Sequence, residues 1–131
     1  MTLLRFIVGR RPAFKHAFRG LKHVLLTQHN ARIHLTATVL VILFGFILKL
    51  EKTEWALVVI AIGLVWITEI TNTALEAFVD LVTKQYHPLA KIAKDTAAAA
   101  VLFASFIAVI LGVIVFLPHL IQWIASLNLL R

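Results

Sequence analysis

Residues 55–81 read WALVVIAIGLVWITEITNTALEAFVDL, and this stretch decides both the fold and the chemistry of the chain. As a helix it is long enough to cross the hydrocarbon core of a bilayer, which takes about 20 residues. Three carboxylates nevertheless lie in its second half, at Glu69, Glu76 and Asp80. At about 100° per residue they share one helix face with Asn72 and Thr73. This polar face needs a partner, because an ionised side chain costs about 2.5–3.5 kcal/mol at the centre of a membrane helix.

A bound metal ion is the partner that this row of acids favours. The alternative is that the helix simply leaves the bilayer here, so that Glu76 and Asp80 are solvated. Cations follow at the start of the next apolar stretch, where Lys94 is suited to meet a phosphate and Asp95 to orient it. The alternative for this lysine is a plain cytoplasmic positive charge with its stem along the membrane surface. The residues alone leave both alternatives open.

The composition excludes an ordinary soluble enzyme. Of 131 residues, 61% are hydrophobic and 15% charged, and the mean hydropathy is +0.95. The absence of cysteine excludes disulfides, thiolate metal sites and a cysteine nucleophile. The chain has no phosphate-binding glycine loop of the known motifs and no HExxH zinc motif. The net charge of +7 is assigned to the membrane surface rather than to nucleic acid, and no histidine is assigned to a metal.

These patterns predict an all-α integral membrane protein with three transmembrane helices and an N-terminal amphipathic surface helix. The chain is expected to form one membrane domain over residues 1–131. Its expected parts are a surface region at 1–32, membrane helices at 33–50, 55–81 and 97–117, and an outer-surface tail at 118–131.

The loops predict the orientation in the membrane. The first 32 residues contain seven lysines and arginines and no acidic residue, so the N-terminus is expected in the cytoplasm and the C-terminus outside. Within this region Phe14, Phe18, Leu21 and Leu25 recur at helical spacing, which predicts a helix lying on anionic lipid. After Pro118, which is expected to end the third span, a similar apolar spacing predicts a short helix on the outer surface.

Two longer motifs carry a family resemblance. They are ExxNTAxExxxD from residue 69 and YHPLAKxAKD from residue 86. In these the chain resembles the prokaryotic diacylglycerol kinase and undecaprenol kinase family, and the resemblance extends over about residues 14 to 117.

The resemblance implies a homotrimer in the bacterial inner membrane that transfers the γ-phosphoryl group of MgATP to the hydroxyl of a membrane lipid. The product would be phosphatidic acid from diacylglycerol, or undecaprenyl phosphate from undecaprenol. Glu69 would be the general base and Glu76 a magnesium ligand. The residues that would position phosphates are Asn72, Lys94 and Asp95. Asp80 would support the site.

The chain departs from the family pattern at one metal position. Gln28 stands where the family has a glutamate as a further metal ligand. An amide oxygen can ligate magnesium but brings no charge. Gln28 is therefore retained as a metal-site residue, with weaker binding of a second metal as the expectation.

Two other functions are alternatives to the kinase. A proton or cation transporter would use Glu69 and Glu76 as a relay, but the first and third spans offer no charge at mid-depth to continue it. A non-catalytic assembly module would tolerate Glu76→Ala. The sequence does not choose between a glycerolipid and a polyprenol substrate, because both offer a primary hydroxyl at the membrane surface.

Overall fold

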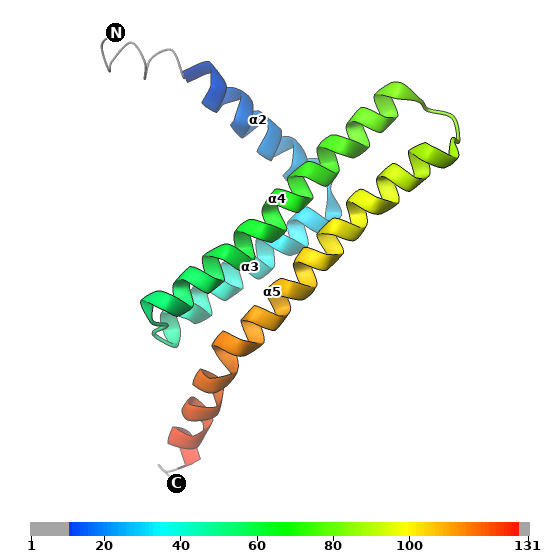
Figure 1. The fold of residues 1–131 in the computed structure, drawn as a ribbon. Helices are drawn as coiled ribbons and strands as arrows, with labels where there is room; N and C mark the ends of the chain where they lie inside the picture. The colour runs from blue at the N-terminus through cyan, green and yellow to red at the C-terminus, as the bar shows by residue number, and fades with distance from the viewer. Residues whose placement is uncertain (1–10, 129–131) are drawn as a thin grey trace.

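The computed structural model describes residues 11–128. Helices are the only regular secondary structure in that range, and short turns and loops join them (Figure 1). The helices are α2 (Arg11–Thr27), α3 (His29–Ile47), α4 (Lys52–Val82) and α5 (Pro88–Asn128). The last three are long and apolar enough to cross a membrane. The predicted all-α fold with three membrane helices and an N-terminal amphipathic helix is confirmed.

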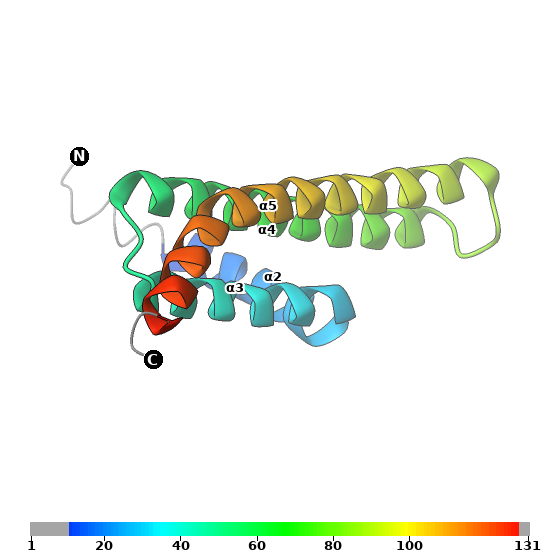
Figure 2. The same ribbon diagram turned by 90° about the horizontal axis from the view of Figure 1, so that it is seen from below.

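Helices α4 and α5 form a long antiparallel pair, joined by a loop at residues 83–87 (Figures 1 and 2). Each contributes a buried stripe at helical spacing. The stripe of α4 comprises Val58, Ala61, Val65, Glu69, Asn72 and Thr73, and that of α5 comprises Ala97, Val101, Ala104 and Val115. Alanine and valine form the whole α5 stripe and the first half of the α4 stripe, and small side chains let membrane helices approach closely. The acidic residue Glu69 thus occupies a position where the repeat requires a core residue.

The turn between α3 and α4 is built around an aromatic side chain. The indole of Trp55 lies so close to Gly45 that a Cβ there would be 2.7 Å from its Cη2 atom. The Trp55 ring also packs on Phe46, with ring centroids 4.9 Å apart. Lys49 turns the chain with a positive φ of 56°, and Leu50 is buried beneath the turn. Glycine at position 45 is therefore required by packing.

Helix α2 leaves the bundle at a steep angle to the other helices (Figure 1). Its C-terminal carbonyls are satisfied from α3, because the Arg32 guanidinium donates to the carbonyl oxygens of Leu25 and Leu26. Phe14 and Phe18 are largely exposed, as a helix lying on lipid requires. The first ten residues of the expected surface region lie outside the described residues.

Helix α5 differs from its predicted bounds at both ends. It begins at Pro88 rather than near Ala97, and it continues through Pro118 to Asn128. The separate outer helix expected after Pro118 is therefore the continuation of α5. A proline removes one backbone hydrogen bond and bends a helix without always ending it. The bend is visible in Figure 2. Residues 129–131 of the expected tail lie outside the described range.

The outward faces of α3 and α5 carry many exposed large apolar side chains. Examples are Leu43, Phe46, Phe103, Phe106, Ile110 and Ile114. Water-soluble monomers seldom expose apolar surface on this scale. These faces suit contact with lipid or with further copies of the chain.

Candidate functional site

A polar cavity of about 260 Å³ lies between α3, α4 and α5, near the start of α3. Four of the residues predicted for the site line it together. They are Gln28, Glu69, Asn72 and Glu76. Of all the side chains that line this cavity, only His34, Glu69 and Glu76 can carry a charge.

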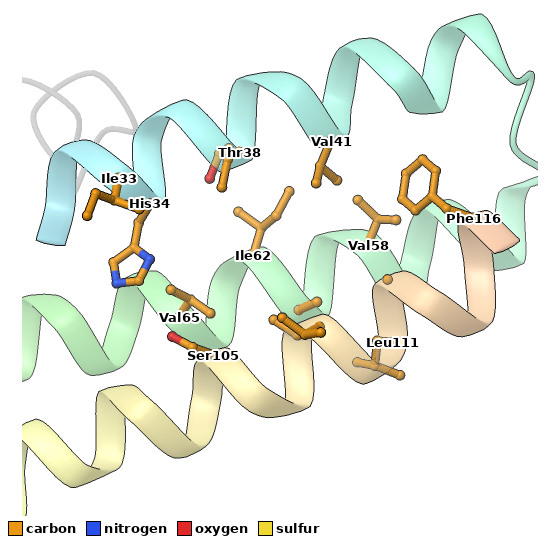
Figure 3. Close-up of a pocket in the computed structure, with 15 residues that line it drawn as sticks. Ile33, His34, Thr38, Val41, Val58, Ile62, Val65, Ser105, Leu111 and Phe116 are labelled. Atoms are coloured by element: carbon orange, nitrogen blue, oxygen red, sulfur yellow. The ribbon is translucent and has the colours of Figure 1, made fainter. Parts of the chain in front are cut away.

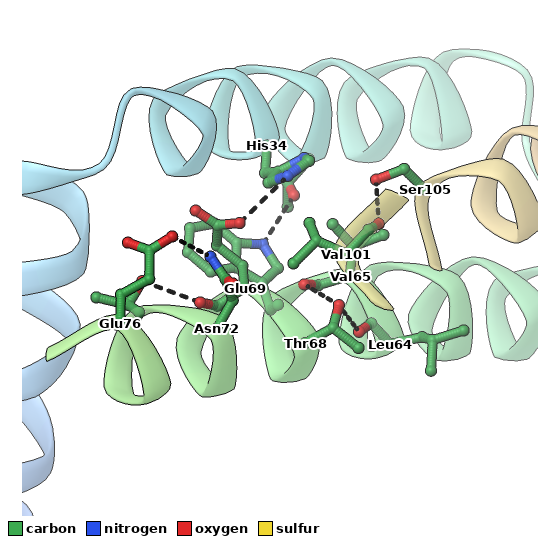
Figure 4. A network of polar contacts seen from close by, with 12 residues as sticks. His34, Leu64, Val65, Thr68, Glu69, Asn72, Glu76, Val101 and Ser105 are labelled. Carbon is green, nitrogen blue, oxygen red and sulfur yellow. Dashed lines mark hydrogen bonds and ion pairs between the residues drawn. The ribbon is translucent and has the colours of Figure 1, made fainter. Parts of the chain in front are cut away.

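Glu69 is the most deeply buried side chain of the site. It is 1% exposed and sits on the core stripe of α4, where valine and alanine occupy the preceding turns. Its Oε2 atom is buried and has no hydrogen-bond partner among residues 11–128. The ring of His34 on α3 faces it, with Nε2 3.9 Å from Oε2 (Figure 4). A buried carboxylate without a hydrogen-bond partner is costly, so Glu69 lowers the stability of the fold.

Two amide side chains hold the Glu76 carboxylate. Asn72, one turn earlier on α4, donates its Nδ2–H to Oε1 at 3.1 Å (Figure 4). Gln28 donates its Nε2–H to Oε2 at 3.4 Å. Gln28 is the N-cap residue of α3, yet its side chain makes no capping hydrogen bond and reaches to Glu76 instead. The Oδ1 atom of Asn72 is buried and unpartnered within the described part of the chain.

The chemistry of this donor set fits magnesium. No three His, Asp or Glu side chains in the described range converge as a complete metal cage. Magnesium does not need such a cage, because proteins commonly hold it through one or two carboxylates together with substrate phosphates. Glu76 would supply a carboxylate, and Gln28 an amide oxygen once its amide group rotates, while the Asn72 amide lies beside them.

A second cluster lies around the loop that joins α4 to α5. Asp80 and Lys94 form an ion pair across the two helices, and Lys91 pairs with Asp95 along α5. These four residues line an open hollow of about 370 Å³. The structure therefore divides the predicted site residues in two: Asn72 belongs to the polar cavity, whereas Lys94 and Asp95 belong to the loop cluster.

An apolar groove of about 400 Å³ continues from the polar cavity along α3, α4 and α5 (Figure 3). Valine, isoleucine, alanine and Phe116 line most of it. Three residues line both the groove and the polar cavity: Ile33, His34 and Ser105. The groove therefore opens beside Glu69, where an apolar chain in the groove would bring its polar end to the carboxylate.

The sequence placed His34 in the family resemblance, within the motif NxRxH from residue 30, but assigned it no role in the site. Its position in the apolar run of α3 was a usable signal, since ionisable residues inside membrane helices are rare and usually face the bundle interior. Its partner was not predictable, because the spacing of residues along α3 contains no information on which α4 residue it meets. A second missed contact is that of His119 with Glu54, at the opposite end of α4.

Comparison with known proteins identifies the family. The family model for prokaryotic diacylglycerol kinase matches residues 15–116. The chain belongs to the prokaryotic diacylglycerol kinase family. Similar proteins are named either undecaprenol kinase or diacylglycerol kinase. The undecaprenol kinase of Bacillus subtilis is 42% identical over 82% of this chain and 88% of its own length. The diacylglycerol kinase of Synechocystis is 46% identical over 84% of this chain and 63% of its own length.

A third relative, the diacylglycerol kinase of Escherichia coli K12, is 33% identical over 79% of this chain and 85% of its own length. Membership of the family makes the chain a lipid kinase, an ATP-using phosphotransferase, as the two motifs of the sequence predicted. These comparisons offer no support for the transporter alternative. The prokaryotic family and the three apolar helices together place the protein in a membrane.

Proposed function

We propose that this lipid kinase transfers the γ-phosphoryl group of MgATP to the hydroxyl of diacylglycerol or undecaprenol, at the cytoplasmic face of the inner membrane. One observation carries the proposal: Glu69 is a buried carboxylate, one oxygen of which has no hydrogen-bond partner among the described residues, and it lies where a polar cavity meets an apolar groove. Such a junction suits a substrate with an apolar tail and a reactive polar end.

The proposed role of Glu69 is that of general base. The lipid hydroxyl oxygen forms a new bond to the γ-phosphorus, the bond from that phosphorus to the β–γ bridging oxygen breaks, and ADP leaves. The hydroxyl proton passes to the Glu69 carboxylate. Burial supports this role, because a carboxylate surrounded by apolar side chains is poorly solvated and gains from accepting a proton.

The proposed metal site comprises Glu76 and Gln28, with the Asn72 amide beside them. When bound there, magnesium would offset the negative charge of the phosphates during transfer. The hydrogen bonds of Gln28 and Asn72 to Glu76 hold the three side chains within reach of one another. This preorganisation supports the assignment.

The proposed nucleotide contacts lie in the loop cluster. Lys94 would bind a phosphate, Asp95 would orient the phosphate chain, and Asp80 would support the site. The ion pair between Lys94 and Asp80 supports this, because it holds the lysine at the end of α4 that also carries Glu76. Phosphoryl transfer depends chiefly on such positioning and charge neutralisation.

The proposed assembly is a homotrimer with the N-terminus in the cytoplasm, forming one membrane domain over residues 1–131. The exposed apolar faces of α3 and α5 support self-association or lipid contact. The basic residues of α2 support the orientation, since cytoplasmic segments near membrane helices are enriched in lysine and arginine.

The test compares the two lipids directly. Purified protein in mixed micelles is given labelled ATP and magnesium with either diacylglycerol or undecaprenol, and the lipid product is identified by chromatography. We expect a phosphorylated product from at least one lipid, and none when magnesium is chelated. The absence of product with both lipids would refute the proposed reaction, and unchanged turnover in chelator would refute the metal assignment.

A further inference from the structure

Within residues 11–128, His34 is the one titratable side chain that another helix directs at Glu69. It comes from the second turn of α3, and its ring lies at the boundary between the polar cavity and the apolar groove (Figures 3 and 4). Its Nε2 atom is buried and has no hydrogen-bond partner within residues 11–128, and the same is true of Oε2 of Glu69. Two buried polar atoms of opposite character thus face each other with nothing else in the described chain to satisfy them.

The distance between them shows that the two atoms face each other without forming a hydrogen bond. At 3.9 Å the two atoms are too far apart for a hydrogen bond. Catalytic hydrogen bonds are often long in the free enzyme and shorten only when the substrate is bound. The side chain of His34 is 17% exposed and that of Glu69 is 2% exposed, so the ring is the more accessible member of the pair.

We propose that His34 is a positioning residue for the lipid kinase reaction, which donates its Nε2–H to Oε2 of Glu69 and so aims the other carboxylate oxygen at the lipid hydroxyl. The inference rests on the proposed function, because it needs Glu69 to be the base. Without this donor the carboxylate is free to rotate about its last torsion, and the oxygen that accepts the proton loses its direction. Precise alignment of a catalytic group by a neighbour is a general requirement of enzyme sites.

Several other side-chain donors around the cavity are hydrogen-bonded to atoms other than Oε2 of Glu69. The nearby hydroxyls are engaged along their own helices: Thr73 donates to the backbone oxygen of Glu69 and Ser105 to that of Val101. The amides of Asn72 and Gln28 donate to Glu76. Among residues 11–128, His34 carries the one basic nitrogen within 4.0 Å of the Glu69 carboxylate.

Three substitutions at this position separate a hydrogen-bonding role from a packing role. His34→Gln keeps an N–H donor at about the reach of Nε2, whereas His34→Asn has a shorter amide and His34→Leu has no donor. We expect His34→Leu and His34→Asn to lower kcat about 10- to 100-fold, the effect of losing one hydrogen bond to a charged group, with KM for ATP and lipid nearly unchanged. We expect His34→Gln to retain kcat within about threefold of the wild type.

Matched controls come from the other histidine that meets a glutamate of α4. His119→Gln and His119→Leu alter the contact with Glu54 and are expected to leave kcat unchanged. Thermal unfolding of each variant shows whether a loss of kcat follows a loss of fold. Should His34→Leu not fold, the comparison of His34→Asn with His34→Gln still decides.

Wild-type kcat in His34→Leu or His34→Asn would overturn the inference, and so would a kcat in His34→Gln as low as in the other two. Glu69→Gln distinguishes this failure from a failure of the proposed function. If Glu69→Gln abolishes turnover while His34→Leu does not, only the role of His34 is wrong. If Glu69→Gln is as active as the wild type, the proposed base and the role of His34 are both wrong.

Discussion

Helix α4 carries a glutamate that faces a histidine at each of two levels, and the two pairs differ in one respect. At the start of the helix, Nε2 of His119 lies 2.9 and 3.0 Å from the two carboxylate oxygens of Glu54, so this contact is closed. Fifteen residues further on, Glu69 and His34 are 3.9 Å apart and both facing atoms are unpartnered in the described range.

The two glutamates differ in how much of their hydrogen-bonding capacity the fold uses. Glu54 also accepts a hydrogen bond from the backbone N–H of Glu51 in a capping box, so its bonding capacity is used within the fold. Glu69 keeps part of its capacity unused inside an apolar stripe, which lowers stability and leaves a group ready for a ligand. We therefore expect the Glu54 end to have a structural role and the Glu69 end to take part in the proposed reaction.

We expect the largest effect on turnover when the two glutamates are replaced by glutamine. Glu69→Gln preserves shape but cannot accept a proton, so we expect kcat to fall by about 10²- to 10⁴-fold. Glu54→Gln, the matched control on the same helix, should keep kcat within about twofold. Turnover in mixed micelles with labelled ATP measures both. An equal loss in the two variants would show that the ends do not differ in function.

The next effect tests whether the turn beside Glu54 is determined by packing. Gly45→Ala places a Cβ 2.7 Å from the Trp55 ring, and we expect a loss of about 1–3 kcal/mol in the free energy of unfolding. The control is Gly63→Ala in α4, where an added Cβ meets no side chain within 4 Å and a helix former replaces glycine. Unfolding in a denaturing detergent compares the two. A Gly45→Ala variant as stable as the wild type would contradict the proposed packing requirement.

A third prediction concerns magnesium binding at Gln28. Gln28→Glu replaces a neutral donor to Glu76 by a second carboxylate, and we expect the apparent Kd for Mg²⁺ to fall by about tenfold because ligand charge increases affinity. Calorimetric titration of the protein with magnesium in the presence of a non-hydrolysable ATP analogue measures the change. Gln122→Glu, at an exposed position of α5, is the control for added charge alone. An unchanged Kd in Gln28→Glu would remove Gln28 from the metal site.

The smallest expected effect is on the unfolding temperature, when the contact between His119 and Glu54 is removed. His119→Ala, Glu54→Ala and the double variant form a cycle in which we expect each single change to lower the unfolding temperature slightly. The double variant should lose less than the sum of the two, because the pair is one interaction. Strict additivity would show that the contact contributes nothing to stability. Each of the three proteins should retain wild-type kcat.

Local patterns predicted most of the fold for a physical reason. Hydropathy over about 20 residues reports whether a helix is stable in lipid, and the helical period reports which side chains share a face. Both are properties of one segment, so the three apolar helices, the amphipathic α2 and the shared face of Glu69, Asn72 and Glu76 were all predictable. The prediction that Pro118 ends the helix is wrong, because the cost of one missing hydrogen bond does not decide whether a long helix continues.

Patterns along the chain predicted three membrane helices with a row of acids on the second, and the resemblance of two motifs to a known family predicted a kinase. The division of the site residues between the polar cavity and the loop cluster depends on how the helices pack. The tertiary structure places Gln28 against Glu76, keeps Lys94 with Asp80 in a separate cluster, and directs His34 at Glu69. The physical reason is that the contacts between helices depend on the angle and depth at which their stripes pack, and no single segment encodes either quantity.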